Sequence, residues 1–364
     1  MAPRSHYARF YGPWLRSQRI RRGWPISTVH ELTSIAEASI SKYERGKESP
    51  NPDNDQLLRK LFGDPPAYLF EPELCLRQPF FFLMPGVNED WQRELNFNML
   101  SGLHETRDFC DPRRVEEDYN WQQYRALWHD VLQHRKDYAG GIAVVSPWNS
   151  EQLNELKELA RNFERPVLFL DHSGSQTTLP DNVASLSFID SIGGNLAAAA
   201  VAQVAQNKNV RRILVVAGPD GIKPDRVEYF KRRLAEIVIS ECEVVISNRG
   251  GFNSVHGAEV SDYHLRAALI TNTPFDVVFY ISDSMTSGGV EAIVRLEIEK
   301  GIAPQIISYD GVASTLELVK KGRIANVVVQ DSRDLARKAI EQLRRLCAGV
   351  AGQRFNSIGP RLFV

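Results

Sequence analysis

Residues 276–312 read DVVFYISDSMTSGGVEAIVRLEIEKGIAPQIISYDGV. Two short runs rich in β-branched and aromatic residues, VVFYI and QIISY, flank a longer segment of helical character. Short runs that are apolar throughout are typical of strands buried on both faces of a parallel sheet. The stretch therefore predicts a strand–helix–strand unit of a doubly wound α/β fold.

The same alternation extends over most of the chain. We predict strands at residues 80–84, 141–145, 167–170, 185–189, 212–217, 243–247, 277–281, 305–309 and 326–329. We predict helices at 150–163, 193–206, 226–238, 256–270, 286–300, 314–321 and 333–346. Nine strands are many for one small sheet, so two lobes with a cleft between them fit better than one.

The distribution of charge along the chain predicts a separate module at its N-terminal end. With 364 residues, 43% hydrophobic and 24% charged, it is an ordinary soluble protein of two or three domains. Its net charge of −1 argues against a generic polyanion binder. Residues 1–64, however, hold eleven Lys and Arg against seven Asp and Glu, a net charge of +4. A basic end on a neutral protein indicates a module with an anionic partner.

The cysteines and the apolar runs indicate a cytoplasmic protein. Cys75, Cys110, Cys242 and Cys347 lie far apart and have neither metal-ligand spacing nor the pattern of a secreted disulfide framework. The sequence has no signal-peptide pattern at its start and no apolar run of about 18 residues. We therefore expect free thiols, no metal and no cofactor.

The basic module has the pattern of short helices around one small core. Gly23 can end the first helix, and Pro25 with the residues after it suits a second start. A turn is predicted near residues 33–36, followed by a third helix from about Glu37. Short polar side chains on that helix would let it enter a DNA major groove, where Lys42 could meet a phosphate or a guanine.

This module resembles the Cro/phage-repressor type of helix-turn-helix domain. The matching residues are Leu15, Arg16, Arg19, Gly23, Ile35, Ile40, Ser41, Lys42, Glu44, Arg45, Gly46 and Pro50. The resemblance implies a structural role for Glu44 and DNA contacts from Arg16, Ser27, Thr28, Glu37, Ala38, Ser39, Ser41 and Lys42. Departures from the family pattern are Ile26, His30 and Ala36. The alternative is a small helical bundle that contacts protein.

Polar residues follow five of the predicted strands in the larger region. They are Asp171-His172, Asp190-Ser191, Ser282-Asp283, Asp310-Gly311 and Gln330-Asp331. Ligands of open α/β sheets bind beyond the carboxyl ends of the strands, so these side chains predict a shared polar cleft. Carboxylates there could bind sugar hydroxyls or amine and amide donors. The alternative for each carboxylate is a helix N-cap.

Residues 80–346 resemble the sensor of lactose-repressor-type regulators and ribose-binding proteins, a periplasmic-binding-protein-like domain of type 1. The resemblance rests on residues 276–312 and on RRILVVAGPDGIKPDRVEYFKRRL, where Arg226 and Phe230 fit an Arg-x-x-Gly-Phe pattern and Tyr229 replaces the glycine. It implies ligand contacts from Trp91, Trp148, Asp171, His172, Arg226, Phe252, Ser282, Asp283, Asp310 and Gln330. The three aromatic residues could equally belong to the core. His172 and Ser282 stand where the family often has arginine and asparagine, so ribose is not assumed.

Together these patterns predict a multi-domain protein: a small all-α module joined to a two-lobed α/β domain. The expected boundaries are 1–63 for the helix-turn-helix, 64–79 for a linker, 80–346 for the sensor and 347–364 for a tail. The expected function is a ligand-responsive transcription regulator, a repressor, that acts as a homodimer or higher oligomer on an operator duplex. Its effector would be sugar-like or nucleoside-like. Alternatives are a sensor that acts through protein partners and an enzyme, for which no nucleotide-binding or nucleophile motif is found.

Overall fold

The computed structural model describes residues 6–65, 78–86, 89–106, 108, 110–118, 120–145, 149–171, 179–218, 223–237, 242–300, 303–350 and 354–364. The chain divides into two compact units. One unit comprises Met1–Val87, Leu95–Leu186 and Arg333–Asn356, and the other Asn88–Glu94, Ser187–Ser332 and Ser357–Val364. The chain therefore passes repeatedly between the units.

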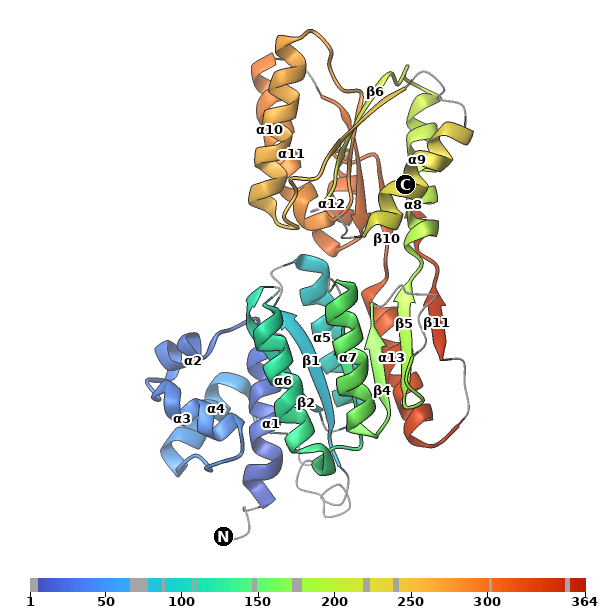
Figure 1. Ribbon diagram of the computed structural model, residues 1–364. Coiled ribbons are helices and arrows are strands. Elements are labelled where there is room, and N and C mark those ends of the chain that lie inside the picture. Colours follow the sequence, from blue (N-terminus) through green and yellow to red (C-terminus); the bar gives the residue numbers. More distant parts are fainter. Residues whose placement is uncertain are drawn as a thin grey trace. The chain divides into compact units, whose positions relative to one another are not determined.

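The first unit begins with a module of short helices (Figure 1). They are α1 (His6–Arg21), α2 (Ile26–Thr33), α3 (Glu37–Glu44) and α4 (Pro52–Phe62). Their shared core consists of Tyr11, Trp14, Leu15, Val29, Ile35, Ile40, Tyr43, Leu58 and Phe62. Gly23 has a φ of +69° just beyond α1, a backbone conformation that favours glycine at a helix end. The helix end at Gly23 and the start at Glu37 agree with the sequence-based expectation.

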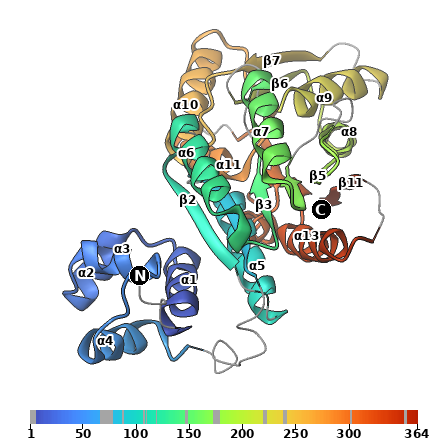
Figure 2. The same ribbon diagram turned by 60° about the horizontal axis from the view of Figure 1, so that its bottom comes forward.

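The same unit also holds a six-stranded sheet. Its order is β11-β5-β4-β3-β1-β2, which places β2 at one edge. The strands are β1 (Phe80–Gly86), β2 (Cys110–Asp118), β3 (Gly140–Val144), β4 (Val167–Leu170), β5 (Val183–Phe188) and β11 (Phe355–Ile358). β1 to β5 pair in parallel. Helices α6 (Trp121–Gln133) and α7 (Ser150–Phe163) cover one face, and α5 (Asp90–Glu105) and α13 (Ser332–Cys347) lie on the other (Figures 1 and 2).

The second unit is built around another six-stranded sheet, of order β12-β10-β9-β8-β6-β7. Its strands are β6 (Arg212–Val216), β7 (Glu243–Ser247), β8 (Val277–Tyr280), β9 (Gln305–Asp310), β10 (Asn326–Val329) and the antiparallel β12 (Arg361–Phe363). Its helices are α8 (Asp190–Ala205), α9 (Pro224–Glu236), α10 (Ser254–Ile270), α11 (Asp283–Lys300) and α12 (Ala313–Lys320). Helices α8 and α9 lie on one face and α10 and α11 on the other (Figures 1 and 2). Two sheets with helices on both faces confirm the predicted α/β class.

All nine predicted strands coincide with strands of the structure, but β2, β11 and β12 were not predicted. β2 reads CDPRRVEED, and the charges of this edge strand hide it from a search for apolar runs. β11 and β12 span four and three residues at the end of the chain, where a tail was expected. Helices α5 and α6 were also not predicted.

The close contact of α1 with α3 leaves no room for a side chain at Gly12. A Cβ atom on Gly12 would lie 2.4 Å from the carbonyl oxygen of Tyr43 and 3.0 Å from that of Glu44. Since both atoms belong to the backbone, Gly12→Ala must push the two helices apart and should destabilise the module by about 1–3 kcal/mol. Hydrogen exchange followed by mass spectrometry should show faster exchange in α1 to α4. Gly359→Ala, where a Cβ meets nothing within 4 Å, is the control. Unchanged exchange in the module would contradict the packing described.

Candidate ligand site and nucleic-acid interface

A buried ion pair holds the helical module together. Arg19 on α1 donates from Nε and Nη2 to the two carboxylate oxygens of Glu44 at 2.6 and 2.8 Å. Arg19 Nη1 donates to the carbonyl of Trp24 at 2.8 Å. Glu44 is only 3% exposed, so it needs such a forked partner to keep its charge in the interior. This geometry gives Glu44 the structural role that the resemblance implied.

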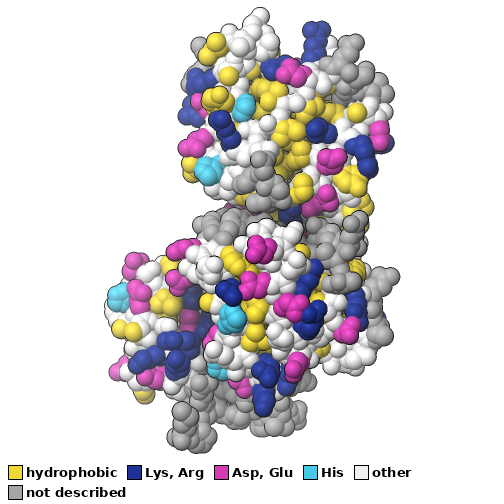
Figure 3. All heavy atoms as spheres, viewed as in Figure 1, with side chains coloured by type: hydrophobic (Ala, Val, Ile, Leu, Met, Phe, Trp, Pro, Cys, Tyr) yellow, Lys and Arg dark blue, Asp and Glu magenta, His cyan; other side chains and the backbone are white. Residues whose placement is uncertain are grey.

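The predicted recognition helix α3 presents a short polar face to solvent. Glu37, Ala38 and Lys42 are exposed, and Ser39 and Ser41 are half-buried. The Lys42 ammonium lies 2.8 Å from Glu48, an exposed pair that water and phosphate can readily replace. On the face shown in Figure 3, Lys and Arg side chains gather on this module, with Asp and Glu side chains among them. A helix that presents a face of short polar side chains to solvent can enter a DNA groove.

The remaining predicted DNA contacts lie on α1 and α2. Ser27 and Thr28 are half-buried near the start of α2. Arg16 instead donates to the carboxylate of Asp111 on β2, at 2.6 Å. The structure therefore brings five of the eight predicted residues onto α3, and it gives Arg16 a carboxylate partner within the first unit.

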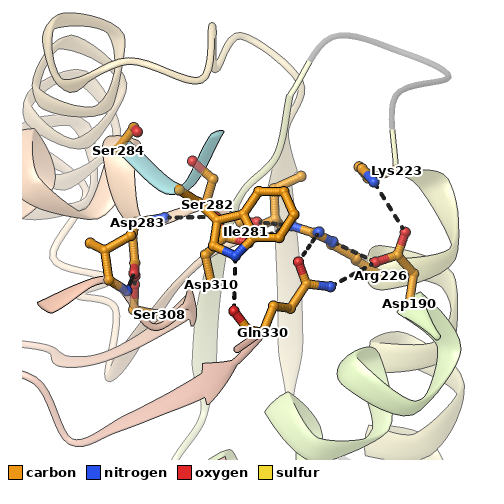
Figure 4. Close-up of polar contacts among 12 residues, drawn as sticks. Asp190, Lys223, Arg226, Ile281, Ser282, Asp283, Ser284, Ser308, Asp310 and Gln330 are labelled. Atoms are coloured by element: carbon orange, nitrogen blue, oxygen red, sulfur yellow. Dashed lines mark hydrogen bonds and ion pairs between the residues drawn. The ribbon is translucent and has the colours of Figure 1, made fainter. Parts of the chain in front are cut away.

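In the second unit, a buried cluster forms where the strands of the second sheet end (Figure 4). Arg226 on α9 is its centre and is 3% exposed. Its Nε donates to Asp190 at 2.9 Å, and its Nη1 donates to the carbonyl of Ile281 at 2.8 Å and to Asp310 at 3.2 Å. Its Nη2 donates to the side chain of Gln330 at 3.0 Å. One guanidinium thus joins the ends of several strands.

Asp310 and Asp283 lie side by side in this cluster, and each is at most 2% exposed. Asp310 has a φ of +100°, a strained value that a non-glycine residue adopts only where its surroundings require it. Asp283 accepts from the hydroxyl of Ser308 at 2.5 Å and from the backbone N–H of Val312 at 2.6 Å. Asp283 therefore ties the end of β8 to β9 and to the loop before α12.

The three carboxyl groups of the cluster, Asp190, Asp283 and Asp310, have pKa values shifted in different directions. Burial alone would raise the pKa of Asp190, but the charges of Arg226 and Lys223 lower it below its usual value. Burial, together with the charge of Asp310, raises the pKa of Asp283 well above its usual range. Burial also raises the pKa of Asp310, against the opposing charge of Arg226. Like-charged carboxyl groups this close favour one shared proton between them.

Ser282 is the neutral polar group without a partner in this cluster. Its side chain is fully buried, and its hydroxyl has no hydrogen-bond partner among the described residues. Most buried hydroxyls are satisfied, so an orphan one at this edge is a candidate ligand contact. Trp91 lies nearby: its indole Nε1 donates to the carbonyl of Gln330 at 2.9 Å. Phe252 has a φ of +51°, and its ring packs directly against Gly218, where a Cβ atom would clash with the ring.

Not every predicted ligand residue can be assigned to this cluster. Asp171 belongs to the first unit, where it follows β4 with a φ of +60°. Trp148 and His172 lie outside the described residues. Asp190 was expected only as a polar residue at the end of a strand, and Lys223, whose ammonium lies 3.7 Å from Asp190, was not predicted. Asp190 and Lys223 have opposite charges, but they lie far apart in the sequence and only the fold brings them together.

The described part of the chain holds no group of side chains suited to a metal ion. No three His, Cys, Asp or Glu side chains are grouped there as a metal site would require. None of the helices described is both long and apolar enough to cross a membrane. Cys110, Cys242 and Cys347 are free thiols.

Solved structures with a similar fold include sugar-binding proteins and a repressor. The solute-binding protein of an ABC transporter from Actinobacillus succinogenes 130z, with bound D-allose, is 16% identical, with a TM-score of 0.68 over 79% of this chain and 97% of that one. The arabinose transporter component of Shewanella sp. ANA-3, with bound L-arabinofuranose, is 18% identical, with a TM-score of 0.66 over 78% and 91%. The Lac repressor dimer bound to operator and the anti-inducer ONPF is 16% identical, with a TM-score of 0.64 over 83% and 98%.

At these identities the structures establish a shared fold only. No curated protein matches the sequence. The model of the periplasmic binding protein domain, however, matches residues 81–351, which include β1 except for its first residue, β2 to β10 and the Arg226 cluster. Because this match spans well over half of its length, the chain belongs to the periplasmic binding protein domain family.

Proposed function

We propose that this protein is a ligand-responsive, DNA-binding transcription regulator, with repression as its expected mode of action. The observation that carries the proposal is the presence, in one chain, of a periplasmic binding protein domain and a helical module whose α3 is exposed. The Lac repressor structure, solved with operator and an anti-inducer, has the same sensor fold and supports the combination.

The helical module supplies the chemistry for a duplex. The clamp between Arg19 and Glu44 fixes α1 against α3, which leaves the polar residues of α3 free to meet base edges. The net charge of +4 in residues 1–64 favours the phosphate backbone in addition. A single module of this size buries little surface, so we infer that two of them bind paired half-sites in a homodimer.

The second unit supplies the chemistry for a neutral polar ligand. Arg226 already donates to Asp190, the carbonyl of Ile281, Asp310 and Gln330, so an anionic ligand would have to displace one of these acceptors. The Ser282 hydroxyl, which makes no hydrogen bond among the described residues, is the group that we expect a sugar or nucleoside hydroxyl to contact. Proteins of this fold that were solved with D-allose and L-arabinofuranose agree with a sugar-like effector. Such a ligand changes DNA affinity only as far as it binds one conformation better than another.

One observation favours the adaptor alternative. Leu32 on α2 is 56% exposed and Leu57 on α4 is 40% exposed, and exposed leucines of this kind can contact another protein. In that case the module would recruit a partner instead of binding DNA. The two functions differ in whether the protein selects a duplex sequence.

Lys42→Ala tests the DNA-binding function. Selection of a duplex from a random-sequence library should first yield an inverted repeat, and binding to it is then measured at several salt concentrations. The variant should bind roughly tenfold more weakly, because one contact to a base edge or phosphate is lost. Its salt slope should fall by about one.

Lys320→Ala is the matched control, because Lys320 forms an exposed pair with Glu317 as Lys42 does with Glu48. Failure of the parent protein to enrich any duplex would contradict DNA binding and favour the adaptor function.

Ser282→Ala tests the ligand site. Its hydroxyl makes no hydrogen bond among the described residues, so its loss should change stability by less than about 0.5 kcal/mol. Affinity for a bound sugar should fall about three- to tenfold. The measurement is calorimetric titration with a panel that includes D-allose, L-arabinose and nucleosides, alongside thermal unfolding.

Ser308→Ala is the control for the same site. Ser308 donates to Asp283 and shares a hydrogen bond with Thr286, so its removal should cost about 1–3 kcal/mol of stability. If the panel binds and Ser282→Ala retains the full affinity, Ser282 does not contact the ligand. If no compound in the panel binds, the proposed ligand class is wrong.

A further inference from the structure

Helix α1 contacts more than the helical module. It packs against α3 and α4, and it also runs along β2, the edge strand of the first sheet (Figures 1 and 2). The module and this sheet belong to one compact unit. A long edge strand usually needs cover to prevent pairing with another chain, and α1 provides cover for β2.

The contact has a polar centre at Asp111 on β2. Arg16 of α1 donates from Nη1 to one carboxylate oxygen of Asp111 at 2.6 Å. The other oxygen accepts from the hydroxyl of Tyr138 at 2.6 Å and from Nε of Arg113 at 2.9 Å. The side chains of Arg16 and Asp111 are only 15% and 12% exposed. This is a desolvated ion pair, unlike the exposed pairs that contribute little.

Asp111 is held in its charged form. Burial by itself would raise its pKa, but the charges of Arg16 and Arg113 and the hydrogen bond from Tyr138 bring the pKa below its usual value. Without Arg16 the carboxylate would keep Arg113 and Tyr138, both of which belong to the sheet side of the contact. Arg16 is therefore the one member of this cluster that comes from the helical module.

Arg16 also reaches toward the recognition helix. Its Nε lies 3.7 Å from Glu44, the last residue of α3, which Arg19 already clamps. A chain of charges thus runs from Asp111 on β2, through Arg16 on α1, to Glu44 on α3. The position of α3 is in this way tied to the edge of the sheet.

A second contact lies near the end of α1. The guanidinium of Arg21 lies 5.3 Å from the ring centre of Phe97 on α5, within range of a cation–π interaction. Burial and then the charge of Arg21 lower the pKa of His104, which also lies on α5. Contacts with β2 and α5 together restrict how α1 can turn. They leave Glu37, Ala38 and Lys42 of α3 exposed.

We propose that α1 is a docking element that fixes the helical module on the first lobe, and that Arg16 positions the recognition helix through Asp111 instead of contacting DNA. The module and the first lobe then move as one body. The role of α3 as a recognition helix rests on the proposed DNA-binding function, but the docking of α1 on the first lobe does not.

The test measures a distance between the module and the lobe. Spin labels are placed on Lys60→Cys in α4 and Ala126→Cys in α6, both exposed, in the full chain with its four native cysteines replaced by alanine. Electron–electron resonance should give one narrow distance distribution. Arg16→Asp should broaden it severalfold, because two carboxylates then face each other across the contact between α1 and β2 and weaken the docking.

Matched variants separate docking from general damage. Arg45→Asp makes the same charge change at an exposed residue of the module and should leave the distribution narrow. Arg16→Met, which keeps much of the side-chain volume, should broaden it even if Arg16→Asp fails to fold by circular dichroism.

The outcomes distinguish this proposal from DNA binding. A broad distribution in the parent chain, or a narrow one in both Arg16→Asp and Arg16→Met, would overturn the docking. The same labelled proteins are then titrated with the duplex enriched from a random library. A narrow distribution without duplex binding would uphold docking and contradict the DNA-binding function. Duplex binding with a broad distribution would contradict docking alone.

Discussion

A buried guanidinium must have hydrogen-bond acceptors for its N–H groups, because it has lost those that water supplies. In the second unit, the ends of the strands supply these acceptors to Arg226. Its four acceptors lie at the ends of four elements. Asp190 begins α8, Ile281 follows β8, Asp310 ends β9 and Gln330 follows β10. Because these groups come from four separate segments, one side chain fixes their spacing. The strained backbone of Asp310 is held by the same contacts.

The same constraint recurs in the first unit. Arg19 and Glu44 join α1 to α3 inside the module, and Arg16 and Asp111 join α1 to β2. Glu44 depends on cations from another element, so breaking its pair with Arg19 leaves a buried charge without its closest partner. Asp111 would keep Arg113 and Tyr138 without Arg16, but it would lose its link to α1. Such pairs contribute less to total stability than the apolar cores beside them, but they fix orientation, since the fork of an arginine accepts few geometries.

The sequence predicts those parts of the fold that depend on local pattern. Continuous apolar runs such as VVFYI locate buried strands, and Gly23 locates a helix end, because burial and backbone conformation act on neighbouring residues. β2 was not predicted because its charged residues, Asp111 among them, are satisfied by partners such as Arg16, ninety-five residues away along the chain. An edge strand of this kind has no local signature.

The candidate ligand site shows the same division. The position of polar residues at strand ends was predictable, since parallel strands end at one edge of a sheet. What each residue does there was not. Asp283 follows β8 as a ligand contact would, yet both of its oxygens accept hydrogen bonds from within the unit. The side-chain hydroxyl of the neighbouring Ser282 has no hydrogen-bond partner among the described residues. Which of two adjacent polar side chains is used internally depends on β9 and the loop after it, and no short stretch of sequence contains that information.

The proposed docking limits how a ligand signal could reach DNA. If the helical module moves with the first lobe, a change within the segment of residues 64–79 is not required for the response. In the homodimer proposed above, the ligand would then alter how two such bodies are placed, and its effect on DNA affinity would be bounded by its difference in affinity for the two arrangements. Since α3 stays exposed beside the docked α1, its geometry within one subunit would be the same in both arrangements. The variable quantity would be the spacing of the two recognition helices, and operators that differ only in half-site spacing would respond differently to the same ligand.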